Sequence, residues 1–133
     1  MNASILLLDK VARATVSLHT QIPESHRSVT IGLGTDRRGT GTLVSRDGLI
    51  VTVNYMIMGA QSVIVTMPNG DQVPGRVVAR DFTTSLGLVQ IDSRDCPHLE
   101  VVSSQTLTLG QDVFVVSSLG GEKRCSQVFL CCR

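Results

Sequence analysis

The chain has 133 residues, a length that suits one domain with one modest hydrophobic core. Its charge is nearly balanced, with 12 Lys and Arg residues against 11 Asp and Glu residues. No long-range electrostatic field therefore draws the chain toward nucleic acid or anionic lipid, and we expect neither as a main partner. Aromatic residues are few, so Val, Leu and Ile must supply the core. Because such side chains suit pleated strands, the composition favours a β fold.

The first apolar run, from Ile5 to Leu8, is too short for a signal-peptide core or a membrane span. We therefore expect a soluble chain with no membrane span, and the cellular compartment stays open. The four cysteines are Cys96, Cys125, Cys131 and Cys132. Three of them gather near the C-terminus, which is not a disulfide framework, and their spacing lacks the short Cys pairs of zinc knuckles. The sequence predicts no metal site and no cofactor.

Helical spacing of Ile5, Leu8 and Ala12 predicts a short N-terminal helix or arm over residues 1–14, with a strand starting at Thr15. Further strands are predicted at residues 29–33, 39–45, 49–52, 61–66, 72–79, 86–91 and 111–116. No helix is expected after the first. Turn signals such as Asp47-Gly48 separate the strands at short intervals, which is typical of an antiparallel barrel or sandwich.

Several short motifs follow one another along the chain in a specific order. They are Gly39-Thr40-Gly41, residues 45–52, Gly59-Ala60, residues 67–70, residues 81–84, residues 86–91 and residues 109–116. In order and spacing this set resembles the HtrA/DegP-type trypsin-like serine protease family, over roughly residues 6–121.

The resemblance implies an all-β, trypsin-like fold. We expect a six-stranded antiparallel Greek-key barrel at residues 15–92, followed at 93–121 by a linker and the first strand or strands of an incomplete second barrel. Residues 122–133 are expected to be a cysteine-rich divergent tail. Alternative splicing, a frameshift and a genuine short protein all remain open as its origin.

The same resemblance locates the family's catalytic triad. In the family a general-base histidine follows a Thr-x-Asn run, and here Thr52-Val53-Asn54 is followed by Tyr55. The orienting aspartate precedes a Leu-Ala-Leu-like strand, and the matching residue here is Ser85. The nucleophile belongs to a Gly-Asn-Ser-Gly-Gly stretch of the second barrel, which no serine of this chain matches. The resemblance therefore implies that no catalytic residue of the triad is intact.

The two substitutions remove the chemistry that the triad needs. A tyrosine titrates near pH ~10 and is seldom deprotonated at neutral pH, so Tyr55 is a poor general base. Ser85 carries no negative charge to stabilise an imidazolium, and disabling a triad costs on the order of a millionfold in turnover.

Other polar residues offer no evident replacement. Nothing in the sequence brings His19, His26 and His98 together, and we expect ordinary surface or half-buried histidines. Asp81 could reach toward Tyr55, but an aspartate at the start of a turn usually binds its own backbone.

Together these features predict an HtrA/DegP-like serine protease homologue that is catalytically inactive as this chain. It would act by binding polypeptide or a homologous protease chain through exposed strand edges, and a homo-oligomer is left open. The alternative is a serine-type endopeptidase subunit involved in protein quality control, in which another chain supplies what Tyr55 and Ser85 lack.

Overall fold

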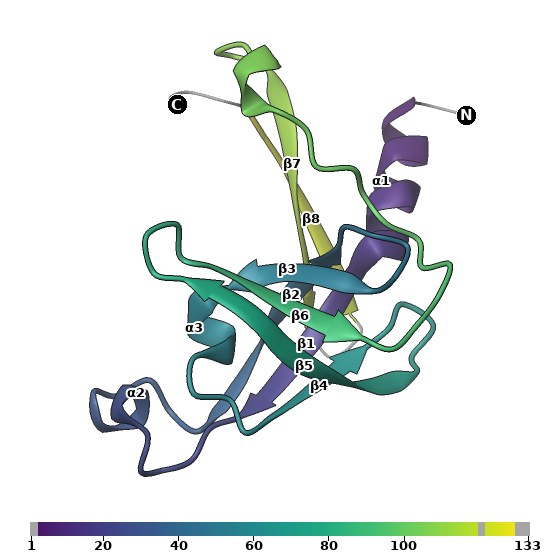
Figure 1. Cartoon of the computed structure of the whole chain (residues 1–133). Coiled ribbons are helices and arrows are strands. Elements are labelled where there is room, and N and C mark those ends of the chain that lie inside the picture. Colours follow the sequence, from purple (N-terminus) through teal and green to yellow (C-terminus); the bar gives the residue numbers. More distant parts are fainter. Residues whose placement is uncertain (1–2, 120–121, 130–133) are drawn as a thin grey trace.

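The computed structural model describes residues 3–119 and 122–129. Helix α1 (Ala3–Ala14) leads into a barrel, and the linker after the barrel ends in a two-stranded hairpin (Figure 1). The barrel strands are β1 (Thr15–Gln21), β2 (Asp36–Leu43), β3 (Leu49–Val53), β4 (Ser62–Thr66), β5 (Gln72–Asp81) and β6 (Leu86–Ile91). The remaining elements are α2 (Arg27–Thr30), α3 (Asn54–Ile57), the 3-10 turn η1 (Ser104–Thr106), β7 (Asp112–Leu119) and β8 (Glu122–Phe129).

The six strands close in the order β1-β2-β3-β6-β5-β4, and every neighbouring pair is antiparallel. This confirms the predicted six-stranded antiparallel barrel. Gly48 makes the tight turn between β2 and β3 with a φ of 90°, and a Cβ there would lie 2.8 Å from the Ile91 carbonyl oxygen. Only glycine fits that position without strain, which explains the Asp-Gly turn signal.

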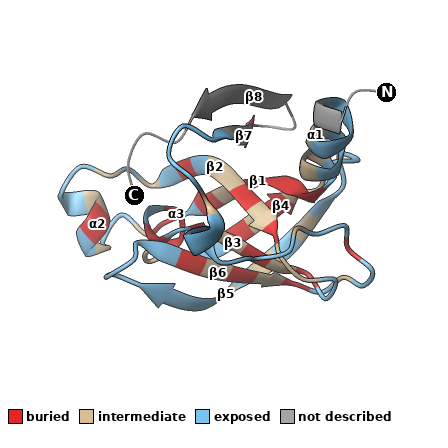
Figure 2. Ribbon diagram, turned by 90° about the horizontal axis from the view of Figure 1, so that it is seen from above, coloured by how far each residue is buried: buried red, intermediate tan, exposed pale blue. Residues whose placement is uncertain are grey.

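The core fills the barrel interior, because alternate side chains of each strand point inward. Val16, Leu18, Ile50, Val65 and Val89 are all buried, and Figure 2 shows the buried positions as short stripes along the strands. Aliphatic β-branched residues dominate this cluster, as the composition predicts.

Two predictions about local structure are wrong. Residues 29–33 do not form a strand: α2 is followed by Gly32 and Gly34, whose φ angles of 98° and 79° turn the chain before β2 begins. The expectation of no helix after the first is also wrong, because α2, α3 and η1 are present. Each of these helices spans only about one turn, too short to show a helical repeat in the sequence.

The hairpin of β7 and β8 packs on the barrel at one end. The Ser118 hydroxyl lies 2.7 Å from the Ser17 hydroxyl of β1, and Thr40 of β2 bonds the Ser118 backbone. Strand β8 pairs with β7 from Glu122 to Phe129, within the segment 122–133 for which the sequence predicts only a divergent tail. The domain boundaries placed at residues 14, 92 and 121 stay predictions. No helix in residues 3–119 or 122–129 is long and apolar enough to cross a membrane.

Candidate functional site

Positions 55 and 85 are brought together by two neighbouring strands. Strand β3 pairs with β6 so that Val53 lies opposite Leu86, and α3 begins at the end of β3. The Asn54 N–H donates a hydrogen bond of 2.7 Å to the Ser85 carbonyl oxygen. Tyr55 therefore directly follows the residue whose backbone bonds Ser85, and the family resemblance aligns positions 55 and 85 with the base and the orienting carboxylate.

The Ser85 backbone lies in the left-handed region, with a φ of 62°. Asp81 begins the turn that presents it: the Asp81 carboxylate accepts bonds from the Thr83 N–H at 3.0 Å and the Thr84 hydroxyl at 2.8 Å. These bonds, the Thr84 hydroxyl first, lower the pKa of Asp81 below its usual value. Asp81 therefore caps its own turn, as the sequence predicts, and its described hydrogen bonds do not reach Tyr55.

The Tyr55 ring contacts the guanidinium group of the buried residue Arg37. The guanidinium carbon of Arg37 lies 4.9 Å from the centre of the Tyr55 ring, a cation–π distance, and Tyr55 is 41% exposed. Arg37 itself is only 1% exposed. The Tyr55 side chain is thus positioned by packing on a charge.

Arg37 donates four hydrogen bonds, two of them to carbonyl oxygens of the α3 segment. Its Nη1 donates to the carbonyl oxygens of Tyr55 at 2.7 Å and Met58 at 3.4 Å, its Nε to that of Gly34 at 3.2 Å, and its Nη2 to the Ser28 hydroxyl at 2.7 Å. No carboxylate of the described residues forms an ion pair with it. Carbonyl dipoles and the Tyr55 ring therefore stabilise the buried charge.

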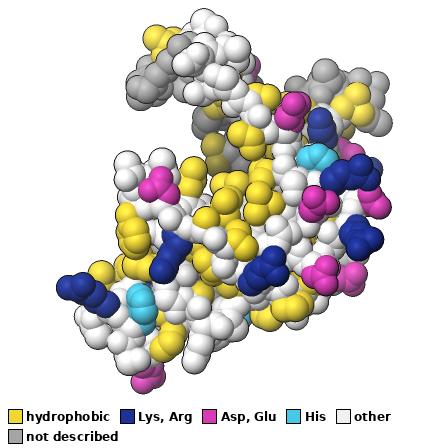
Figure 3. All heavy atoms as spheres, in the orientation of Figure 1, with side chains coloured by type: hydrophobic (Ala, Val, Ile, Leu, Met, Phe, Trp, Pro, Cys, Tyr) yellow, Lys and Arg dark blue, Asp and Glu magenta, His cyan; other side chains and the backbone are white. Residues whose placement is uncertain are grey.

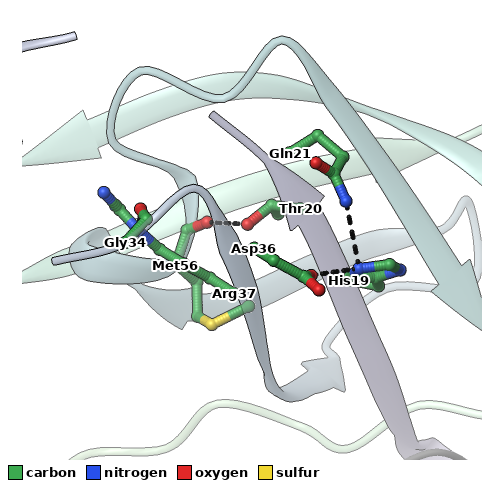
Figure 4. A network of polar contacts seen from close by, with 7 residues as sticks. All are labelled: His19, Thr20, Gln21, Gly34, Asp36, Arg37 and Met56. Carbon is green, nitrogen blue, oxygen red and sulfur yellow. Dashed lines mark hydrogen bonds and ion pairs between the residues drawn. The ribbon is translucent and has the colours of Figure 1, made fainter. Parts of the chain in front are cut away.

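A second bond anchors α3 from the neighbouring strand. The Thr20 hydroxyl of β1 donates to the Met56 carbonyl oxygen at 2.7 Å (Figure 4). The Asn54 side-chain Oδ1 is buried and has no hydrogen-bond partner among the described residues. The α3 segment is thus held by hydrogen bonds from Thr20 of β1 and Arg37 of β2.

The sequence missed the role of Arg37, because residues 34–38 resemble a turn. The signal that could have found it is the alternation of β2, in which Leu43, Gly41 and Arg37 are all buried. A charged residue at an inward position of a strand is unusual without a specific set of acceptors.

The three histidines lie apart, as expected. His19 pairs with Asp36 on the exposed side of β1 and β2 (Figure 4), and His26 accepts a bond of 3.1 Å from the Ser28 N–H. His98 Nδ1 lies 3.0 Å from the Cys96 carbonyl oxygen. None of these described bonds joins a histidine to Tyr55 or Ser85.

Metal ligands do not gather in the part of the chain that the structure describes. It contains no group of three or more His, Cys, Asp and Glu residues that could hold an ion. Cys96 is buried as a free thiol. The Cys125 side chain, Cys131 and Cys132 lie outside what the structure describes, so the rejection of a zinc site stays a prediction.

An apolar hollow of about 370 Å³ adjoins position 85. It is lined by Val51, Ala79, Arg80, Asp81, Thr84, Leu86, Gly87 and Leu88. Leu86 is 47% exposed, and Val53 and Phe82 near it are also exposed. Figure 3 shows hydrophobic side chains gathered over this face of the barrel.

Comparisons with known proteins agree with this architecture. The family model described as "Trypsin-like peptidase domain" matches residues 39–129. A "Probable periplasmic serine endoprotease DegP-like" of Pseudomonas savastanoi pv. phaseolicola is 28% identical over 106 residues, 76% of this chain and 22% of the relative. A protein of the same name from Chlamydia pneumoniae is 38% identical over 73 residues, 55% of this chain and 15% of the relative.

The fold is similar to a solved structure described as "HtrA-type protease AlgW with tripeptide", with a TM-score of 0.83 and 18% identity. That match covers 98% of this chain and 40% of the solved one, and at this identity it shows the fold alone. The chain spans less than half the length of each of these relatives. The family model shows that the chain belongs to the trypsin-like peptidase family, and its DegP-like relatives support the HtrA/DegP type within it.

Proposed function

We propose that this chain is a noncatalytic HtrA/DegP-type homologue that binds extended polypeptide on the barrel face beside position 85. One observation carries the proposal. Asn54, the residue directly before Tyr55, donates its N–H to the Ser85 carbonyl oxygen at 2.7 Å. The family resemblance aligns these positions with the general base and its orienting carboxylate.

The side chains at the two positions supply neither function. A neutral phenol is a poor acceptor for the proton of a serine hydroxyl, and a serine hydroxyl carries no charge that would hold an imidazolium. Tyr55 is also committed to Arg37, because the cation–π contact favours a ring that lies flat against the guanidinium. The side chains at positions 55 and 85 therefore lack the acid–base chemistry that a triad needs.

The apolar hollow supports polypeptide as the ligand. Its lining includes the apolar side chains of Val51, Leu86 and Leu88. It also includes Arg80 and Asp81, which carry one charge of each sign. An extended chain buries alternate side chains against such a surface, at about 25 cal/mol per Å² of apolar area removed from water. The DegP-like relatives are named endoproteases and the AlgW structure is described with a tripeptide, which also favours a peptide ligand.

Binding of unfolded casein by the purified chain tests this proposal. We expect fluorescence anisotropy of labelled, carboxymethylated casein to show saturable binding, and Leu86→Asp to weaken it at least tenfold because a charge replaces the lining side chain. Val101→Asp, at a 74% exposed position on the linker, is the matched control and is expected to bind as the native chain does. Circular dichroism verifies that both variants are folded. Equal binding by Leu86→Asp and the native chain would refute the proposed surface.

A further inference from the structure

The ring of His26 accepts a backbone hydrogen bond at its Nδ1 atom. His26 is the N-cap of α2, and its Nδ1 accepts the Ser28 N–H at 3.1 Å. The Ser28 hydroxyl lies 2.8 Å from the same nitrogen. A backbone N–H can only donate, so Nδ1 must carry a lone pair and no proton. These contacts assign His26 the neutral ring, with its single ring proton on Nε2.

The Ser28 hydroxyl connects His26 to Arg37. The Nη2 of Arg37 donates to Ser28 Oγ at 2.7 Å, which leaves the hydroxyl proton available to donate to His26 Nδ1. Ser28 and Arg37 are 2% and 1% exposed, so water has little access to these bonds. Arg37 in turn donates to the carbonyl oxygens of Tyr55 and Met58. A continuous row of hydrogen bonds thus joins His26 to the α3 segment.

The His26 ring also packs directly against the chain that leaves α3. A Cβ at Gly59 would lie 2.5 Å from the ring, so the ring occupies the space that any larger residue would need. Figures 1 and 2 show α2 and α3 at the same end of the barrel. The ring therefore touches the α3 segment by packing as well as through the hydrogen bonds of Ser28 and Arg37.

The surroundings of His26 do not favour a positive charge on its ring. The charged and titratable groups on the elements packed against it are Arg37 of β2, Tyr55 of α3 and, on its own loop, the exposed Glu24 and Arg27. Asp36 and Arg38 alternate to the outer face of β2, where Asp36 pairs with His19. Among the described residues no carboxylate forms an ion pair with His26. A proton on the ring would therefore add a second cation beside buried Arg37 without a paired carboxylate.

The other two histidines make contacts that a protonated ring can keep. His98 Nδ1 lies 3.0 Å from the Cys96 carbonyl oxygen, so that nitrogen already donates. His19 pairs with the Asp36 carboxylate, and a charge on the ring strengthens such a pair. Of the three, His26 alone uses a ring nitrogen to accept a backbone N–H in the described hydrogen bonds. Acidification therefore removes a contact at His26 and none at the other two.

We propose that His26 is a pH-sensitive latch on the α3 segment, closed while the ring is neutral and opened when the ring takes up a proton. On protonation the Ser28 N–H loses its acceptor, and Ser28 Oγ is left between two cations, His26 and Arg37. The bonds from Arg37 to the carbonyl oxygens of Tyr55 and Met58 then lose their support from α2. Histidine is the side chain whose charge changes in the physiological pH range, so the latch opens in mild acid.

Amide hydrogen exchange measured by NMR, corrected for the intrinsic exchange rate at each pH, tests the latch in the full 133-residue chain. The reporters are the N–H of Ser28, bonded to His26, and the N–H of Met58, bonded to the Asn54 carbonyl oxygen at 2.9 Å. From about pH 8 to about pH 5 we expect the protection of both to fall about tenfold. The Ile91 N–H, bonded to the Gly48 carbonyl oxygen at 3.0 Å, reports on the barrel and should keep its protection. Unchanged protection of Ser28 and Met58 would overturn the proposal.

Three variants show whether the response comes from His26. In His26→Asn the side-chain oxygen can still cap α2 but does not titrate, so both reporters should become insensitive to pH. His98→Asn is the matched control and should respond as the native chain does. Ser28→Ala removes the hydroxyl between His26 and Arg37, so the N–H at position 28 should still respond to acid while Met58 no longer does. An acid response of Met58 that persists in His26→Asn or Ser28→Ala, or that is lost in His98→Asn, would contradict the inference.

Discussion

The hydrogen bonds of Arg37 predict that this one residue supports the loop beneath Tyr55. Arg37→Met keeps the length of the buried side chain but leaves the Tyr55 carbonyl oxygen and the Ser28 hydroxyl without their 2.7 Å donors. Hydrogen bonds to charged groups contribute about 1.5–3 kcal/mol each, partly offset because the guanidinium is no longer desolvated. We expect the free energy of unfolding to fall by roughly 2–4 kcal/mol.

Urea denaturation followed by circular dichroism measures that loss, and tyrosine fluorescence reports the site itself. Tyr55 is the only tyrosine and the chain has no tryptophan, so the signal has a single source. Arg38→Met is the matched control, because Arg38 is the exposed neighbour on β2 and its replacement should change stability by less than about 0.5 kcal/mol. An Arg37→Met variant as stable as Arg38→Met would refute the reasoning.

Two further predictions concern single turns. Gly59 has a φ of 77°, and a Cβ there would lie 2.5 Å from the His26 ring, so Gly59→Ala should cost about 2 kcal/mol or more in thermal unfolding. Gly32→Ala, at φ 98° in open space, should cost about 1 kcal/mol, and equal losses would exclude the ring contact. The Thr84 hydroxyl lowers the pKa of Asp81 below 3.8, so this bond stabilises the fold above that pH and the stabilisation disappears as the pH falls through the lowered pKa. Thr84→Val should raise the pKa of Asp81 toward 3.8 in an NMR titration of its carboxyl carbon, and an unchanged titration would contradict the assignment.

The barrel could be predicted because its signals are local. Apolar alternation marks most of its strands, and Gly48 and Gly70, with φ angles of 90° and 95°, occupy two of the turns between them. No single segment shows that the strands close into a barrel; that prediction came from the family resemblance and is confirmed by the pairing of β1 with β4.

The segment before β2 could not be predicted from its residues. Residues 29–33 have β-branched side chains, but the buried contact of Ser28 with Arg37 and the positive φ angles of Gly32 and Gly34 override that propensity. The hydrogen-bond acceptors of Arg37 come from three separate segments of the chain, so no local sequence pattern predicts that Arg37 is buried.

The site was predicted in part. The motifs around them identify Tyr55 and Ser85 in the sequence, but the hydrogen bond between Asn54 and Ser85 depends on the pairing of β3 with β6. The apolar hollow beside Leu86 combines residues of three strands and a turn, which no single stretch of sequence shows.

The central claim is that positions 55 and 85 cannot support serine protease chemistry in this chain. Its most direct test is casein turnover by the purified chain, with a fluorophosphonate probe that labels activated serines and the double variant Tyr55→His, Ser85→Asp as comparison. We expect no turnover and no labelling by either form, because restoring the two side chains does not supply an activated nucleophile. Probe-sensitive turnover by the native chain would contradict the claim.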